Sequence, residues 1–72
     1  MSLKALIAEQ LGISEEEVGD NSHFIEDLGG DALDVVEIIM EVEEVYELEI
    51  SEEDAVKLLT YIDLYDYIEA HK

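Results

Sequence analysis

Residues 27–34, Asp-Leu-Gly-Gly-Asp-Ala-Leu-Asp, place a double glycine directly before the start of an amphipathic segment. Glycine adopts the positive φ angles of tight turns without steric cost, so this pair predicts a turn. Asp31 is a typical N-cap residue, because its carboxylate can accept a hydrogen bond from a backbone N–H of the first helical turn. Asp34 adds negative charge near the positive end of the helix dipole. We therefore expect a helix that begins at Asp31 and whose first exposed side chain is the methyl group of Ala32.

The helix that begins at Asp31 is predicted to run to about Tyr46, and it has apolar residues on two opposite faces. One face is an ordinary core stripe, formed by Val35, Ile38, Ile39, Val42, Val45 and Tyr46. The opposite face holds Leu33, Val36, Glu37, Met40, Glu44 and Glu47. Apolar side chains ringed by carboxylates are typical of a protein docking surface. Scattered surface hydrophobes are the alternative, because single exposed apolar residues are common.

Three other segments have helical spacing, and each begins or ends at a residue that caps helices. The first ends at Gly12, where glycine suits the left-handed conformation at a helix C-terminus. A single turn after it has the capping-box spacing of Ser14 and Glu17. Ser51 and Thr60 are expected to cap a short third helix and a fourth one. The apolar positions are Leu3, Leu6, Ile7 and Leu11 in the first helix, Ala55, Leu58 and Leu59 in the third, and Tyr61, Leu64, Tyr65 and Ile68 in the fourth.

These segments predict an all-α fold, a small irregular four-helix bundle with three main helices and a short third helix. No segment has the period-two alternation of a strand. With 72 residues, the chain is expected to form one domain over 1–72 with a single small core. It has no cysteine, so apolar burial rather than disulfides must hold the fold.

The chain is strongly acidic, with 21 Asp and Glu residues against three Lys and Arg residues and a formal net charge of -18. This charge repels phosphate backbones and anionic lipids, so we expect neither nucleic acid nor a membrane as a partner. A basic patch on another protein would instead be attracted. The plainer interpretation is that acidity only keeps a small protein in solution. Disorder is not expected, because apolar residues make up 49% of the chain.

The residues that enzymes and metal sites need are absent or isolated. Two histidines without any thiol do not supply the ligands of a structural zinc site. His23 is expected to be a loop residue and His71 lies near the C-terminus, so no nucleophile–base pair can be named. We expect neither an enzyme nor a metal site. With no signal peptide or membrane-spanning run in the sequence, the expected location is the cytoplasm, or an organelle matrix after processing.

From about Leu6 to Ile68, the sequence resembles the acyl carrier proteins. The resemblance rests on residues 24–31 (Phe-Ile-Glu-Asp-Leu-Gly-Gly-Asp), 33–37, 50–55 and 66–68. It implies that a serine after Asp31 would accept a 4'-phosphopantetheine arm, whose thiol carries acyl groups between enzymes of fatty acid or polyketide synthesis. Here that position is Ala32, beside Leu33. Without a hydroxyl no phosphodiester can form, so the resemblance implies an unmodified chain that carries no cofactor.

The resemblance also implies two sets of contact residues. The first set would contact basic-surfaced enzymes of acyl chain synthesis and transfer. For a parent with serine in place of Ala32, these enzymes include a phosphopantetheinyl transferase. The chain itself is expected to be a monomer. The resemblance assigns six positions to this first set, and the outward helix face adds Val36. The full set is Leu33, Asp34, Val36, Glu37, Met40, Glu43 and Glu44. A cavity that shelters the acyl chain would be lined by Phe24, Ile38, Val42, Ile50, Ala55 and Ile62, although each is equally explained as a core residue.

Two explanations of Ala32 remain open. The serine of a carrier has been replaced deliberately, or a natural relative has lost the carrying function and kept the docking surface. The first is favoured because the double glycine and Asp31 remain suited to modification. Two other functions also remain: an acidic interaction module that stabilises or regulates a partner through the second helix, and an acidic cation-binding protein.

Overall fold

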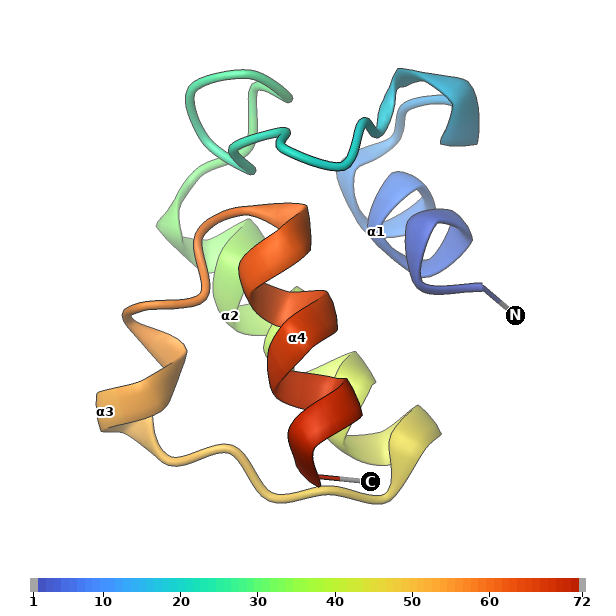
Figure 1. The fold of residues 1–72 in the computed structure, drawn as a ribbon. Helices are drawn as coiled ribbons and strands as arrows, with labels where there is room; N and C mark the ends of the chain where they lie inside the picture. Colours follow the sequence, from blue (N-terminus) through green and yellow to red (C-terminus); the bar gives the residue numbers. More distant parts are fainter. Residues whose placement is uncertain (1, 72) are drawn as a thin grey trace.

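The helices of this chain begin and end at capping residues, largely where the sequence predicts them. The computed structural model describes residues 2–71. Its helical elements are α1 (Leu3–Leu11), the 3₁₀ turn η1 (Glu15–Glu17), α2 (Ala32–Tyr46), α3 (Glu52–Ala55) and α4 (Tyr61–His71). Residues 2–71 contain no strand. The predicted all-α fold with a short third helix is therefore confirmed (Figure 1).

Local side-chain hydrogen bonds define the helix starts. The backbone N–H of Ala5 donates to Ser2 Oγ at the start of α1 (3.1 Å). Ser51 Oγ accepts from the backbone of Asp54 at the start of α3 (3.2 Å), and Thr60 Oγ1 accepts from that of Asp63 in α4 (3.3 Å). Each bond satisfies one of the backbone donors that a helix N-terminus leaves without an intrahelical partner. The caps predicted at Ser51 and Thr60 are confirmed.

The core is formed by apolar side chains from α1, α2 and α4, together with Phe24 between η1 and α2 and with Val18, Ile50 and Leu58 from other connecting segments. Among the described residues no polar or charged side chain is buried. Burial of each large apolar side chain contributes roughly 1.5–3 kcal/mol, so these residues dominate the stability of the fold. The largest fully buried side chains are Phe24, Ile7, Ile38, Leu64 and Val42.

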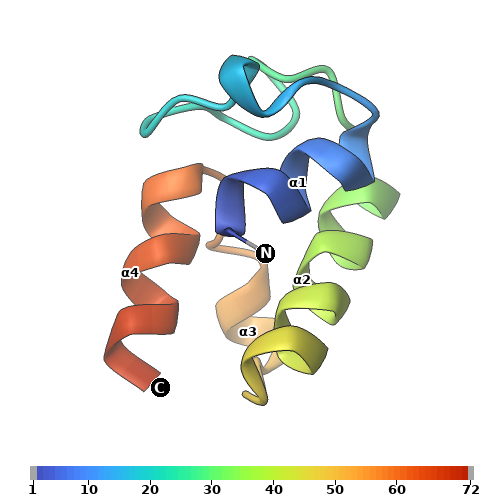
Figure 2. The ribbon, with the colours of Figure 1, turned by 90° about the vertical axis from the view of Figure 1, so that its right-hand side faces the viewer.

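The three longer helices surround this core, and the chain between α1 and α2 crosses one end of the bundle (Figures 1 and 2). That crossing segment is tied to the start of α4 by an isolated antiparallel bridge between His23 and Thr60. The short α3 contributes no buried residue. None of the helices among residues 2–71 is long and apolar enough to cross a membrane.

Val45 corrects the predicted core stripe of α2. Its side chain is 46% exposed, whereas Val35, Ile38, Ile39 and Val42 are buried as predicted. Val45 lies at the margin of the stripe and in the last turn of the helix, where Tyr46 packs against the core instead. A stripe about 100° wide leaves residues at its margin dependent on what neighbouring elements cover. Helical spacing alone could not decide that coverage.

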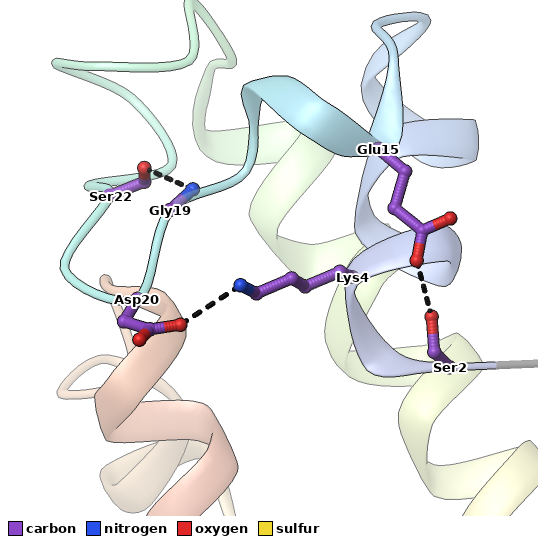
Figure 3. Close-up of polar contacts among 6 residues, drawn as sticks. All are labelled: Ser2, Lys4, Glu15, Gly19, Asp20 and Ser22. Atoms are coloured by element: carbon purple, nitrogen blue, oxygen red, sulfur yellow. Dashed lines mark hydrogen bonds and ion pairs between the residues drawn. The ribbon is translucent and has the colours of Figure 1, made fainter.

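Lys4 of α1 reaches Asp20 of the crossing segment at one end of the bundle (Figure 3). Its Nζ atom lies 2.9 Å from Asp20 Oδ1 in the crossing segment and 5.2 Å from the centre of the Tyr61 ring in α4. The hydrogen bond to Asp20 raises the pKa of Lys4 above its usual value. Beside it, the Ser2 hydroxyl donates to Glu15 Oε1 (2.9 Å). These contacts place one of the few cations where it bridges separate segments.

Added salt is expected to stabilise this fold. With a net charge of -18, the folded state concentrates carboxylates on a small surface, and ions screen their repulsion. About 0.5 M potassium chloride should raise the melting temperature by about 5 °C, and magnesium or calcium chloride should raise it as well. Thermal unfolding followed by circular dichroism measures the change. A melting temperature that stays constant or falls would show that the carboxylates do not oppose folding.

Candidate functional site

A largely apolar groove with a volume of about 580 Å³ lies beside α2. α2 forms one wall and α3 contributes to the other. Its lining is mainly aliphatic, and two carboxylates are part of it. The lining residues are Ile25, Ala32, Val35, Val36, Ile39, Met40, Glu43, Ile50, Glu52, Ala55, Val56 and Leu59.

A reciprocal capping box fixes the start of α2 at one end of the groove. Asp31 Oδ1 accepts from the backbone N–H of Asp34 (3.0 Å), and Asp34 Oδ2 accepts from that of Asp31 (3.1 Å). Ala32 is therefore the first residue of the helix, and its methyl group is exposed. Both the predicted cap and the predicted exposure of Ala32 are confirmed.

The two glycines before this cap are each required by the geometry. Gly29 has a φ angle of 75°, in the left-handed region. A Cβ atom at Gly30 would lie 2.8 Å from Leu11 Cδ2 and 2.9 Å from the carbonyl oxygen of Phe24. Any larger residue at Gly30 would push the turn away from α1 and the crossing segment. The double glycine thus sets where α2 begins relative to the core.

The outward face of α2 exposes the apolar side chains that the sequence places there. Leu33 is 73% exposed and Met40 is 61% exposed, and Val36 is also exposed. Val36 and Met40 lie at the groove as well as on the outward face. Contact of these residues with a partner stays a prediction.

Sequence reasoning missed two residues at the edge of the groove. Ile25 and Val56 are both exposed, Val56 by 69%, although neither belongs to the outward face of α2. Val56 follows directly after α3, and Ile25 lies in the crossing segment. Both segments are too short for helical spacing to be recognised in the sequence. Each residue could be seen only as a large apolar side chain next to a charged one, Glu26 or Lys57.

Several carboxylates that were predicted to meet partners also make bonds within the chain. Glu37 Oε2 accepts a short hydrogen bond from Gln10 Nε2 of α1. Glu43 Oε2 accepts from the backbone N–H of Ile50 (3.0 Å), and Asp34 belongs to the capping box. Glu44 is exposed on α2. The Glu43 bond supports the chain between α2 and α3, where it adjoins the groove.

The residues predicted to line an acyl cavity are divided between three environments. Phe24, Ile38 and Val42 are fully buried in the core and do not reach the groove. Ile50 and Ala55 line the groove, whereas Ile62 on α4 is exposed and lies outside it. The groove takes its remaining apolar lining from Val35, Ile39 and Leu59. A role for any of them in sheltering a ligand stays a prediction.

The wall formed by α3 is held to α4 by a hydrogen bond between side chains. The Tyr67 hydroxyl donates to Asp54 Oδ2 (3.1 Å). Partial burial raises the pKa of Tyr67, and the bond to Asp54 raises it further. α3 has no fully buried residue, so this bond and the packing of Ala55 against the core are the contacts that position it.

The serine and threonine hydroxyl groups of the chain belong to segments other than the start of α2. Each of the residues concerned stands at a helix N-cap or within a turn, where its oxygen or backbone supports local structure. These residues are Ser2, Ser14, Ser22, Ser51 and Thr60. Within residues 2–71, no group of three or more His, Cys, Asp or Glu side chains is arranged to hold a metal ion.

One comparison with known families bears on this site. Residues 2–68 match the sequence profile of a protein family described as phosphopantetheine attachment site. The match begins at the Ser2 cap and ends within α4, so it includes the groove and Ala32.

The bond between Glu43 and the backbone of Ile50 is expected to contribute to stability. Glu43→Ala removes the acceptor and should lower the free energy of unfolding by about 1 kcal/mol, because a partly buried N–H loses its partner. Glu43→Gln keeps an acceptor oxygen and should retain most of that stability. Glu44→Ala is the matched control on the exposed side of α2. Urea unfolding measures all three variants, and equal stability of Glu43→Ala and Glu44→Ala would contradict the structural role of Glu43.

Proposed function

Because the chain belongs to the family of phosphopantetheine-attachment domains, we propose that it is an acyl carrier protein of fatty acid or polyketide synthesis in a form that cannot be loaded. Members of this family carry acyl groups and do not catalyse reactions themselves. The proposal places Ala32 at the position where such a carrier has its serine. In this form the chain would contact the enzymes of acyl chain synthesis without presenting an acyl intermediate to them.

The exposed methyl group of Ala32 is the observation that carries this proposal. It is the first residue of α2, directly after the Asp31 cap and at the edge of the groove. A serine in this place would present its hydroxyl to solvent, where a modifying enzyme can reach it. The surrounding capping box and double-glycine turn are intact.

The residues of this chain do not fit covalent attachment of 4'-phosphopantetheine. A phosphodiester needs a side-chain hydroxyl, and Ala32 has none. The serine and threonine hydroxyl groups elsewhere in the chain belong to caps and turns of other segments. Acyl transfer through a tethered thiol is therefore closed to the chain in this form.

Docking onto partner enzymes does not depend on the missing hydroxyl. Leu33 and Met40 are exposed apolar anchors on α2, and Glu44 adds negative charge beside them. The net charge of -18 favours an enzyme that presents a basic patch, because opposite charges accelerate encounter and orient the partners. We propose that this face, with Asp34, Val36, Glu37 and Glu43 as further members, meets basic-surfaced synthases and transferases.

The second candidate is an interaction module that never carries cargo. It would bind and stabilise or regulate a partner through α2. The observation in its favour is the same: the anchors on α2 are exposed while the attachment position bears a methyl group. The two candidates differ in what happens when the hydroxyl is supplied.

Replacing Ala32 by serine is expected to make the chain a substrate of a phosphopantetheinyl transferase. With coenzyme A, Ala32→Ser should gain the mass of one phosphopantetheine group, because the turn, the cap and the docking face are already in place. The parent chain and Ala32→Val should gain nothing. Intact-mass spectrometry separates these outcomes. A folded Ala32→Ser chain that gains no mass would contradict the carrier proposal and favour the interaction module.

Substitutions on α2 are expected to change binding to the same transferase in two different ways. Glu44→Lys should slow association and weaken its salt dependence, because rim charges act mainly on encounter. Met40→Ala should mainly hasten dissociation, because the complex loses an apolar anchor that is exposed in the free chain and becomes buried against the partner. Surface plasmon resonance at two salt concentrations measures both rates.

Glu16→Lys is the charge-matched control, because Glu16 lies on η1, outside α2. If it slows association as much as Glu44→Lys does, the effect comes from net charge and not from a docking face. If Glu44→Lys and Met40→Ala both bind like the parent, α2 is not the docking surface.

A further inference from the structure

The imidazole of His23 supports the turn that leads towards α2, and it does so as a hydrogen-bond acceptor. Its Nδ1 atom accepts from the backbone N–H groups of Ile25 (3.2 Å) and Glu26 (3.1 Å). A ring nitrogen that accepts carries no proton, so this geometry requires Nδ1 to be unprotonated. Ser, Thr, Asn and Asp ordinarily fill such a role with a side-chain oxygen. Here a titratable group occupies it.

The backbone of the same residue is a second centre of hydrogen bonding. The His23 carbonyl accepts from the backbone N–H groups of Asp27 (3.0 Å) and Leu28 (3.1 Å). The His23 N–H donates to Asp27 Oδ2 (2.8 Å). Side chain and backbone of His23 together therefore hold residues 25–28 in one compact turn.

This turn is connected to the groove and to the start of α2. The backbone N–H of Gly30 donates to the carbonyl of Phe24 (2.9 Å), and Asp31 and Ala32 follow directly. Ile25, whose N–H is bonded to the imidazole, lines the groove. A change in the His23 turn would therefore reach both the groove margin and the segment that leads to Ala32.

Several charged groups lie on the elements that contact His23. The titratable groups on the elements that contact His23 are Glu26 and Asp27 in its own turn, with the Asp27 carboxylate bonded to the His23 backbone N–H, and Tyr61 and Asp63 in the first turn of α4, which follows the bridged Thr60. Lys4 is paired with Asp20 of the crossing segment and lies against the Tyr61 ring. A proton on Nδ1 would face the two backbone N–H donors of Ile25 and Glu26, so both hydrogen bonds to the ring would be lost.

We propose that His23 is a positioning residue for the groove margin and the start of α2, and that protonation of its Nδ1 atom releases the turn. The turn and the proton compete for the same lone pair, so the turn is better formed at higher pH. This inference does not depend on the chain being a carrier. It assigns to the crossing segment a pH response that is local to residues 23–30.

Amide hydrogen exchange of the full chain, resolved residue by residue by NMR, tests the proposal. Protection factors for Ile25, Glu26 and Gly30 are compared at about pH 7.5 and about pH 5.5, within the range where imidazoles change charge. Protection factors correct for the intrinsic pH dependence of exchange. For the parent, those of Ile25 and Glu26 should fall by about fivefold at the lower pH, as expected for loss of one hydrogen bond each, and Gly30 should follow in the same direction.

Two variants separate the imidazole from its surroundings. His23→Asn places Oδ1 where Nδ1 lies and does not titrate, so its protection should be the same at both pH values. His23→Leu has no acceptor and should show low protection at both. If His23→Asn loses protection as the parent does, the carboxylates cause the response and the proposal is wrong. It is also wrong if the parent does not change, or if His23→Leu keeps the parent's protection.

The Asn variant keeps the test decisive even if His23→Leu does not fold. His71→Gln controls for the second histidine, which lies in the last turn of α4, where its Nδ1 atom is 2.8 Å from the carbonyl oxygen of Tyr67. It should leave the pH response of Ile25 and Glu26 unchanged, and abolition of that response by His71→Gln would overturn the assignment to His23.

Discussion

Apolar burial around Phe24 has to outweigh the mutual repulsion of a highly acidic surface. The fully buried side chains come from α1, α2, α4 and the crossing segment, and no polar side chain among the described residues is buried with them. Burial is almost independent of salt, whereas the repulsion is not. The carboxylates are therefore kept at the surface, where water and ions reduce their cost. Several of them also serve the fold as caps, as Asp31 and Asp34 do for α2.

The parts of the structure that depend on short-range chemistry could be predicted from the sequence. The caps at Asp31, Ser51 and Thr60 need only a side-chain oxygen and an N–H three residues later, so spacing identifies them. The glycine that ends α1 could be predicted for the same reason, because the left-handed conformation of Gly12 (φ 71°) depends only on the residue itself and its neighbours in sequence. The helical fold and the first exposed position of α2 followed from these local signals.

The parts that depend on packing between distant segments could not be predicted in this way. Val45 is exposed because no neighbouring element covers the margin of its stripe. Glu37 and Glu43 bond to Gln10 and to the backbone of Ile50, contacts that no helical wheel displays. The groove was also invisible, since its edge combines Ile25 and Val56 from irregular segments with residues of α2. Family resemblance identified the meaning of Ala32, because a lone methyl group indicates no chemistry by itself.

α3 forms part of one wall of the groove and has no fully buried residue, so apolar burial stabilises this wall less than it stabilises the core. Its four residues contact the core only through the partly buried Ala55, and the bond between Tyr67 and Asp54 connects them to α4, whereas Ile38, Val42 and Leu64 are fully buried. Opening of such a unit requires less free energy than global unfolding. The wall of the groove that α3 forms therefore depends on fewer buried contacts than the wall that α2 forms. A surface built in this way can accept occupants of different sizes without any change in the fold that supports it.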